Sequence, residues 1–150
     1  MEYNYTSKSV EETMQLAENI ESKKFPGMLL CLEGELGSGK TVFVKGLAKS
    51  LGIEETITSP TFTLIKEYDE GEMPLSHMDV YRIEGDPTTL GLEDYFNSSA
   101  ICIIEWANLI NNYLPKERLD IKLKLIDENT RLITLIPHGK QYEDLVKSVI

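Results

Sequence analysis

Four residues in the stretch GELGSGKT, at positions 34–41, have the spacing of a phosphate-binding loop. In the pattern G-x-x-x-x-G-K-[ST], the four matching residues are Gly34, Gly39, Lys40 and Thr41. Glycines let backbone N–H groups turn inward around phosphate oxygens, and a helix that follows presents its positive end to the same anion. The stretch therefore predicts a site for a nucleoside triphosphate.

The residue types in this stretch predict contacts with the nucleotide and its metal ion. Lys40 is expected to reach the β- and γ-phosphates, and the hydroxyl of Thr41 is expected to ligate Mg²⁺. The expected nucleotide-binding residues are Glu35, Leu36, Gly37, Ser38, Gly39, Lys40, Thr41 and Val42. The alternative is a glycine-rich turn with an incidental lysine. A predicted strand before the loop and a predicted helix after it favour nucleotide binding.

Two carboxylates could complete such a site, because a phosphate-binding loop needs an acid near Mg²⁺. Asp79 ends the run LSHMD, and Glu105 ends the nearly all-apolar run AICIIE. The carboxyl ends of parallel strands open beside such a loop. Either acid could bind the metal ion or orient an attacking water molecule, and the sequence leaves their roles exchangeable. The alternative is a strand-end acid paired with a nearby cation, such as Arg82 for Asp79.

The stretch TITSPTFT, residues 56–63, carries five hydroxyl groups around Pro60. It could be a turn that leads into a threonine-rich strand. It could also be a switch-like loop in which Thr61 or Ser59 approaches the γ-phosphate. The residues alone leave both interpretations open.

Two further side chains carry weaker signals. Trp106 follows the second acid, and a single tryptophan beside a buried strand is more often part of a core than of a contact surface. His77 stands in the run HMD, which is too short to indicate a metal site.

The composition is that of a soluble globular protein, and the 150 residues are expected to form a single domain. No apolar run approaches the ~20 residues of a membrane helix, and the first residues lack the pattern of a signal peptide. Cys31 and Cys102 lie in apolar runs, so we expect buried thiols in a reducing cytoplasm. The net charge of −10 disfavours direct binding of nucleic acid.

The predicted elements form an α/β domain with a mixed, mostly parallel sheet, flanking helices and a C-terminal antiparallel hairpin. A helix is expected from the capping residue Ser9 to about Lys24, with Val10, Met14, Ala17 and Ile20 on one face. A second helix should run from the loop to Leu51 and stop at Gly52. The expected strands before the hairpin are 28–33, 61–68, 74–79 and 100–105. A short helix is expected over 87–96. The strands of the hairpin are expected over 119–126 and 131–136, and a last helix should begin at about Gln141.

Five blocks along the chain, in this order, resemble the successive blocks of one family. They are GELGSGKT, SPTFTLIKEY, HMDVYRI, LGLEDYF and IIEWANLI. Over about residues 6–137 the chain resembles the bacterial tRNA threonylcarbamoyladenosine biosynthesis ATPase, the TsaE family. The first block is common to many families, whereas SPTFT, HMDVYR and IEW in combination are far more specific.

The resemblance implies a P-loop ATPase that works with TsaB-type and TsaD-type partner proteins. Together these proteins install threonylcarbamoyl on N6 of adenosine 37 in tRNAs that read ANN codons. A TsaE-like protein does not transfer the group itself: it binds the partner pair and uses the hydrolysis of Mg-ATP to reset it between turnovers. The partners would hold the tRNA, which agrees with the acidic surface, and no membrane is involved.

The same resemblance assigns roles to residues in the matching blocks. The implied catalytic residues are Lys40, Glu105, Asp79 and Thr61, and the implied metal ligands are Thr41, Asp79 and Glu105. With the resemblance, Trp106 is expected to be a site or interface residue instead of a core residue. The rival functions are a small-molecule kinase and a nucleotide-dependent regulatory module. Kinases usually place several arginines on a lid, and this chain has three arginines and no lid-sized insertion.

Overall fold

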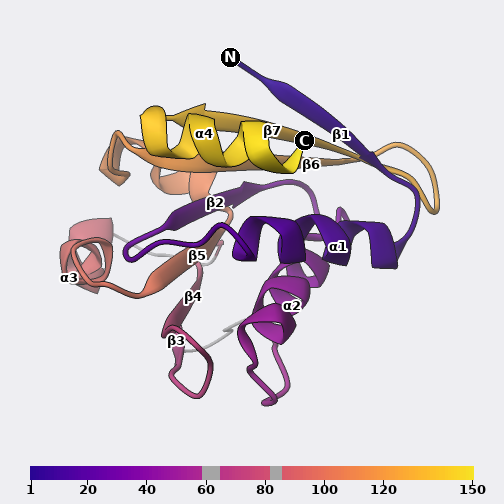
Figure 1. Cartoon of the computed structure of the whole chain (residues 1–150). Coiled ribbons are helices and arrows are strands. Elements are labelled where there is room, and N and C mark those ends of the chain that lie inside the picture. The colour runs from indigo at the N-terminus through magenta and orange to yellow at the C-terminus, as the bar shows by residue number, and fades with distance from the viewer. Residues whose placement is uncertain (59–64, 82–85) are drawn as a thin grey trace.

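The computed structural model describes residues 1–58, 65–81 and 86–150. The strands are β1 Tyr3–Ser7, β2 Leu29–Glu33, β3 Ile65–Tyr68, β4 Leu75–Asp79, β5 Ile101–Glu105, β6 Arg118–Leu125 and β7 Arg131–His138. The α-helices are α1 Val10–Glu21, α2 Lys40–Leu51, α3 Leu92–Phe96 and α4 Lys140–Val149, and the 3₁₀ segments are η1 Pro87–Leu90 and η2 Ala107–Tyr113. In the described part of the chain, these strands form one seven-stranded sheet in the order β1-β7-β6-β2-β5-β4-β3 (Figure 1).

The centre of the sheet is parallel and its margins are antiparallel. Strand β2 pairs in parallel with β5 on one side and with β6 on the other, and β4 pairs in parallel with β5. Strands β3, β7 and β1 join antiparallel to β4, β6 and β7. The predicted mixed α/β sheet with a C-terminal hairpin is therefore confirmed. Because β2, β4 and β5 run in one direction, their carboxyl ends meet at the same edge of the sheet.

Strand β1 is an element that the sequence analysis did not predict. It pairs antiparallel with β7, from Tyr3 opposite Leu135 to Ser7 opposite Arg131. Its alternating pattern is short and polar, with two partly buried tyrosines packed against the core. A strand of this composition becomes stable only through its partner, and that partner lies more than 120 residues away along the chain.

The cap of helix α1 follows the prediction in part. The hydroxyl of Ser9 accepts a hydrogen bond from the backbone N–H of Glu12 at 3.1 Å. The carboxylate of Glu12 accepts from the N–H of Lys8 at 3.0 Å, one residue before the position that a capping box requires. The helix ends at Glu21, three residues earlier than predicted.

The buried face of α1 differs from the predicted face. The buried residues are Thr13, Leu16, Ala17, Ile20 and Glu21. Val10, predicted to be buried, is 56% exposed in the first turn, because Thr13 and Leu16 take the inward positions. Helix α1 also crosses α2 closely: a Cβ on Gly46 would lie 2.8 Å from the Cα of Met14.

The later elements match their predictions with shifted ends. Helix α2 ends at Leu51 with Gly52 as its cap, as predicted. The short helix expected over 87–96 is two pieces, η1 and α3, separated by Gly91 in a left-handed conformation. Of the strand expected over 61–68, the last four residues form β3, and the first four lie outside the described residues.

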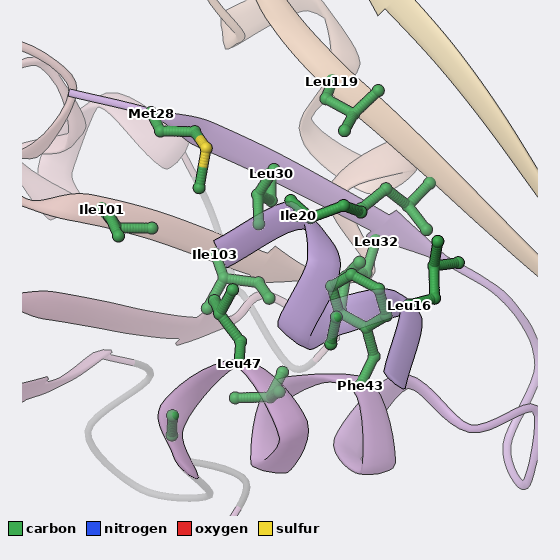
Figure 2. Close-up of a cluster of buried hydrophobic side chains, with 14 of the residues drawn as sticks. Leu16, Ile20, Met28, Leu30, Leu32, Phe43, Leu47, Ile101, Ile103 and Leu119 are labelled. Atoms are coloured by element: carbon green, nitrogen blue, oxygen red, sulfur yellow. The ribbon is translucent and has the colours of Figure 1, made fainter. Parts of the chain in front are cut away.

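The hydrophobic core has two parts, one on each face of the sheet. Helices α1, α2 and α4 cover one face, and α4 runs along β6 and β7 (Figure 1). Figure 2 shows side chains of α1 and α2 meeting those of β2 and β5; the labelled ones include Leu16, Ile20, Leu30, Leu32, Phe43, Leu47, Ile101 and Ile103. The other face packs against α3 and η2. This double cover explains why β5 is buried along its whole length.

Both cysteines are buried, as predicted, and they lie in the second part of the core. Cys31 and Cys102 are buried free thiols on neighbouring strands. Burial raises the pKa of the Cys102 thiol to about 12, and it raises the pKa of Cys31 further. In the described residues, no helix is both long enough and apolar enough to cross a membrane.

The central strand supplies a test of this core. Leu30 is fully buried between the sheet and its helices, so Leu30→Ala should lower the free energy of unfolding by about 2–5 kcal/mol. Leu125 is 50% exposed at the end of β6, and Leu125→Ala should stay within about 0.5 kcal/mol of the parent protein. Urea unfolding followed by circular dichroism measures both. Equal losses in the two variants would contradict the placement of Leu30.

Candidate functional site

The glycine-rich loop, residues 34–39, joins the carboxyl end of β2 to the start of α2. Gly39 has a φ of +104°, a conformation that favours glycine, and its carbonyl accepts the helical hydrogen bond from the N–H of Phe43 at 2.9 Å. A Cβ on Gly34 would lie 2.5 Å from the Oγ of Ser38 and 2.6 Å from the carbonyl oxygen of Leu123. The predicted strand–loop–helix unit is present, and the backbone geometry requires glycine at both ends of the loop.

Lys40, the first residue of α2, directly follows this loop and is 6% exposed. Its ammonium donates hydrogen bonds to the carbonyl oxygens of Gly34 and Glu35, the second at 3.0 Å. It also lies 4.1 Å from the ring centroid of Trp106. Burial lowers the pKa of Lys40, and the carboxylates of Glu105 and Asp79 oppose that shift. A positive charge is thus enclosed by the loop and by two nearby acids.

The two predicted acids are direct neighbours in the sheet. Asp79 on β4 lies opposite Glu105 on β5 in the parallel register. Glu105 is 2% exposed, and its Oε1 lies 3.4 Å from the Oγ1 of Thr41, whose hydroxyl donates to it. The sheet edge and the first turn of α2 therefore meet at Glu105.

Asp79 occupies a more open position than Glu105. Its Oδ1 accepts a hydrogen bond from the backbone N–H of Tyr81 at 3.0 Å. Burial raises the pKa of Asp79, the Tyr81 hydrogen bond opposes this shift, and the charge of Glu105 adds to it. The two carboxylates, which the sequence left exchangeable, thus have different surroundings.

His77 is a site residue that the sequence analysis missed. It is fully buried on β4, and its Nε2 lies 2.6 Å from the Oε2 of Glu105. The run HMD is too short to indicate a metal site, and a pattern within one strand does not show a contact with another strand. A useful signal was present: His77 precedes Asp79 by two residues, so both side chains lie on the same face of the strand.

Trp106 lies beside Lys40 in the structure and directly follows Glu105 in the chain. Its ring lies 4.5 Å from that of Tyr81, centroid to centroid, at an interplanar angle of 37°. Among the described residues other than glycine, Trp106 alone has a positive φ, of +63°. Such a conformation costs of order 1–3 kcal/mol in a bulky residue. It places the indole directly after Glu105 and over the ammonium of Lys40.

The remaining loop residues differ in exposure. The side chain of Leu36 is 77% exposed, whereas Ser38 is 1% exposed and its Oγ has no hydrogen-bond partner among the described residues. The carbonyl of Gly37 accepts a hydrogen bond from Arg131 at 3.2 Å, which ties the loop to the hairpin. Val42 lines a hollow of about 70 Å³ together with Val10 and Thr13 of α1.

The structure thus brings together five of the predicted residues: Lys40, Thr41, Asp79, Glu105 and Trp106. Thr61 and Ser59 of the proposed switch-like loop, and Arg82, lie outside the described residues. Within the described ranges, no group of three or more His, Cys, Asp or Glu side chains is arranged to hold a metal ion. That finding is compatible with Mg²⁺, which commonly takes one or two carboxylates together with phosphates and water.

These features place the chain among the mixed α/β proteins that are built around a central strand, a glycine-rich loop and a helix. The family model described as "Threonylcarbamoyl adenosine biosynthesis protein TsaE" matches residues 7–133. The chain belongs to the TsaE family.

Individual relatives agree with this assignment over most of the chain. The tRNA threonylcarbamoyladenosine biosynthesis protein TsaE of Bacillus subtilis is 48% identical over 139 residues, which is 93% of this chain and 88% of that protein. The protein of the same name from Nostoc sp. PCC 7120 is 39% identical and covers 91% of this chain and 86% of its own length. A crystal structure of Bacillus subtilis YdiB matches with a TM-score of 0.87 at 41% identity, over 99% of this chain and 94% of the other.

The close approach at Gly34 can be tested by adding one carbon atom. Gly34→Ala should lower the free energy of unfolding by about 1–3 kcal/mol, because the new Cβ meets Ser38 and a backbone carbonyl. Adding Ser38→Ala should recover only part of the loss, since the carbonyl of Leu123 stays in place. Chemical unfolding of the parent protein and of these two variants measures the effect. Parental stability of Gly34→Ala would show that the loop has room for a side chain.

Proposed function

We propose that this chain is the ATPase component of the machinery that makes N6-threonylcarbamoyladenosine at position 37 of tRNA. It binds Mg-ATP and hydrolyses it to support turnover of a TsaB–TsaD-type partner pair, and it does not transfer the threonylcarbamoyl group. Membership of the TsaE family supports the place in tRNA modification. One structural observation supports the ATPase activity: Glu105 lies against Thr41, beside the enclosed ammonium of Lys40.

The donors gathered at the loop suit a triphosphate. Lys40 donates to carbonyl oxygens of its own loop, which are weaker partners than phosphate oxygens. The buried hydroxyl of Ser38 has no partner among the described residues, and the first N–H groups of α2 face the loop. We propose that the phosphates are held by residues 35–42, with Lys40 contacting the terminal phosphates.

The acids and Thr41 supply oxygen ligands of the kind that Mg²⁺ prefers. The hydroxyl of Thr41 would hold the ion together with Glu105 or Asp79. When bound, Mg²⁺ would neutralise charge on the phosphate oxygens. Glu105 offers a fixed carboxylate that can accept a hydrogen bond from a water molecule and orient it. We also propose that Thr61, in the stretch of residues 56–63, approaches the γ-phosphate.

The acidic charge of the chain supports indirect contact with tRNA. At a net charge of −10, the protein repels a polyanion unless a basic patch is present. The proposal therefore assigns tRNA binding to the partner proteins, and ATP hydrolysis to this chain. We propose a cytoplasmic location, where tRNA and ATP are both present.

Phosphate release from ATP tests this function directly. The chain alone should hydrolyse Mg-ATP slowly, and addition of the TsaB–TsaD-type pair should stimulate the rate clearly, because turnover serves that pair. Malachite-green detection of phosphate, with and without the pair, measures the effect. Indifference to the pair, or transfer of the phosphate to a metabolite, would contradict the proposal.

Two alanine variants test the residues that carry the chemistry. Lys40→Ala and Glu105→Ala should each reduce stimulated phosphate release by about 10²-fold or more, because each removes a charge placed against the phosphates or the metal ion. Lys45→Ala, an exposed lysine on the same helix, is the matched control and should hydrolyse ATP at the parental rate. Circular dichroism checks that the variants fold. Normal turnover in Glu105→Ala would move the catalytic role to Asp79.

A further inference from the structure

The pair formed by His77 and Glu105 is buried almost completely from solvent. The side chain of His77 is 0% exposed and that of Glu105 is 3% exposed, and 2.6 Å separate Nε2 from Oε2. A carboxylate removed from water needs hydrogen bonds to offset its lost hydration. His77 supplies one of them.

The sheet register determines which oxygen His77 reaches. Asp79 lies opposite Glu105, and His77 lies opposite Ile103, so the imidazole approaches Glu105 diagonally from the inner part of the sheet. The two carboxylate oxygens therefore have different partners. Oε2 points to His77, and Oε1 points to Thr41 at the start of α2.

The other ring nitrogen indicates where the proton of the imidazole lies. The Nδ1 of His77 is buried and has no hydrogen-bond partner among the described residues. A buried N–H without an acceptor is costly, whereas the neutral ring can leave a lone pair at that position. The proton accordingly belongs on Nε2, which makes His77 the donor and Oε2 of Glu105 the acceptor.

We propose that His77 is a positioning residue that holds Oε2 of Glu105, so that Oε1 is the oxygen directed to Thr41 and to the nucleotide. This inference rests on the proposed function, in which Glu105 directs the metal ion or the attacking water. The hydrogen bond to His77 restrains the side-chain torsions of Glu105 and with them the position of each carboxylate oxygen. Small errors in the position of a catalytic group are costly to the rate.

A purely structural role for His77 makes a different prediction. Replacing a buried polar pair member by an apolar side chain of similar size affects mainly stability. The folded fraction of such a variant would then turn over normally. If His77 is instead a positioning residue, its replacement should lower kcat in the folded protein while the affinity for nucleotide is retained.

Nuclear magnetic resonance tests the hydrogen bond without relying on activity. The chain contains only two histidines, His77 and His138, so the ring ¹⁵N signals are few and His77→Gln assigns them. We expect a protonated Nε2 in His77, coupled to a proton that exchanges slowly with water. An unprotonated Nε2 would overturn the proposal, whether or not the chain hydrolyses ATP.

Kinetics of matched variants test the consequence. His77→Leu removes the donor and should lower stimulated kcat about ten- to a hundredfold, with a much smaller change in KM for Mg-ATP. His77→Gln keeps an N–H at similar reach and should restore most of kcat. His138→Leu is the control: its ring also contacts a carboxylate, that of Asp120 at 2.8 Å, and kcat should be unchanged.

The outcomes separate the two proposals. Parental kcat in folded His77→Leu, or equal losses in the Leu and Gln variants, would overturn the role of His77. Absence of ATP hydrolysis in the parent chain with its partners would overturn the proposed function, and the ring ¹⁵N signals would still decide whether His77 donates to Glu105. Thermal melting of each variant shows whether it is folded under the assay conditions.

Discussion

The carboxylate of Glu105 is buried at the edge of the sheet, and the arrangement of the site depends on how its charge is stabilised. A buried carboxylate without partners is too unfavourable for a marginally stable fold. Glu105 has His77 from β4, Thr41 from α2 and the nearby ammonium of Lys40. Each partner comes from a neighbouring element that the parallel sheet brings to the same edge. The charge therefore links the packing of the fold to the geometry of the site.

The charges of the site also depend on one another. Burial disfavours the ammonium of Lys40, and the two carboxylates counteract that effect. The aromatic face of Trp106 adds a favourable contact with Lys40, and Trp106 has a left-handed backbone conformation directly after β5. The strained residue and the enclosed ammonium are therefore in direct contact. An arrangement with charges already in place suits the stabilisation of a charged transition state, since little reorganisation is needed.

Much of this site could be predicted because its residues follow strict local rules. The glycine spacing and the lysine predict the loop, and Asp79 and Glu105 follow from the carboxyl ends of two buried strands. The contact between His77 and Glu105 could not be predicted in the same way, because it depends on the register between β4 and β5. Spacing along one strand shows the face on which a side chain lies, and it does not show the residue diagonal to it.

The fold shows the same division between local and long-range information. The loop, helix α2 and the hairpin have strong local patterns, and each was predicted. Strand β1 was missed because its polar, tyrosine-containing sequence becomes a strand only against β7. The buried face of α1 was predicted incorrectly at Val10, where tertiary contacts favour Thr13 and Leu16 as the inward residues.

We propose that the glycine-rich loop, with Lys40 and Glu105, forms the site for Mg-ATP. Calorimetric titration of the chain with Mg-ATP tests it most directly, because it measures binding apart from turnover and from the partners. We expect saturable binding of one nucleotide per chain, which is lost in Lys40→Ala and retained in Lys45→Ala. Binding that is equally strong in Lys40→Ala, or no binding by the parent chain, would contradict it.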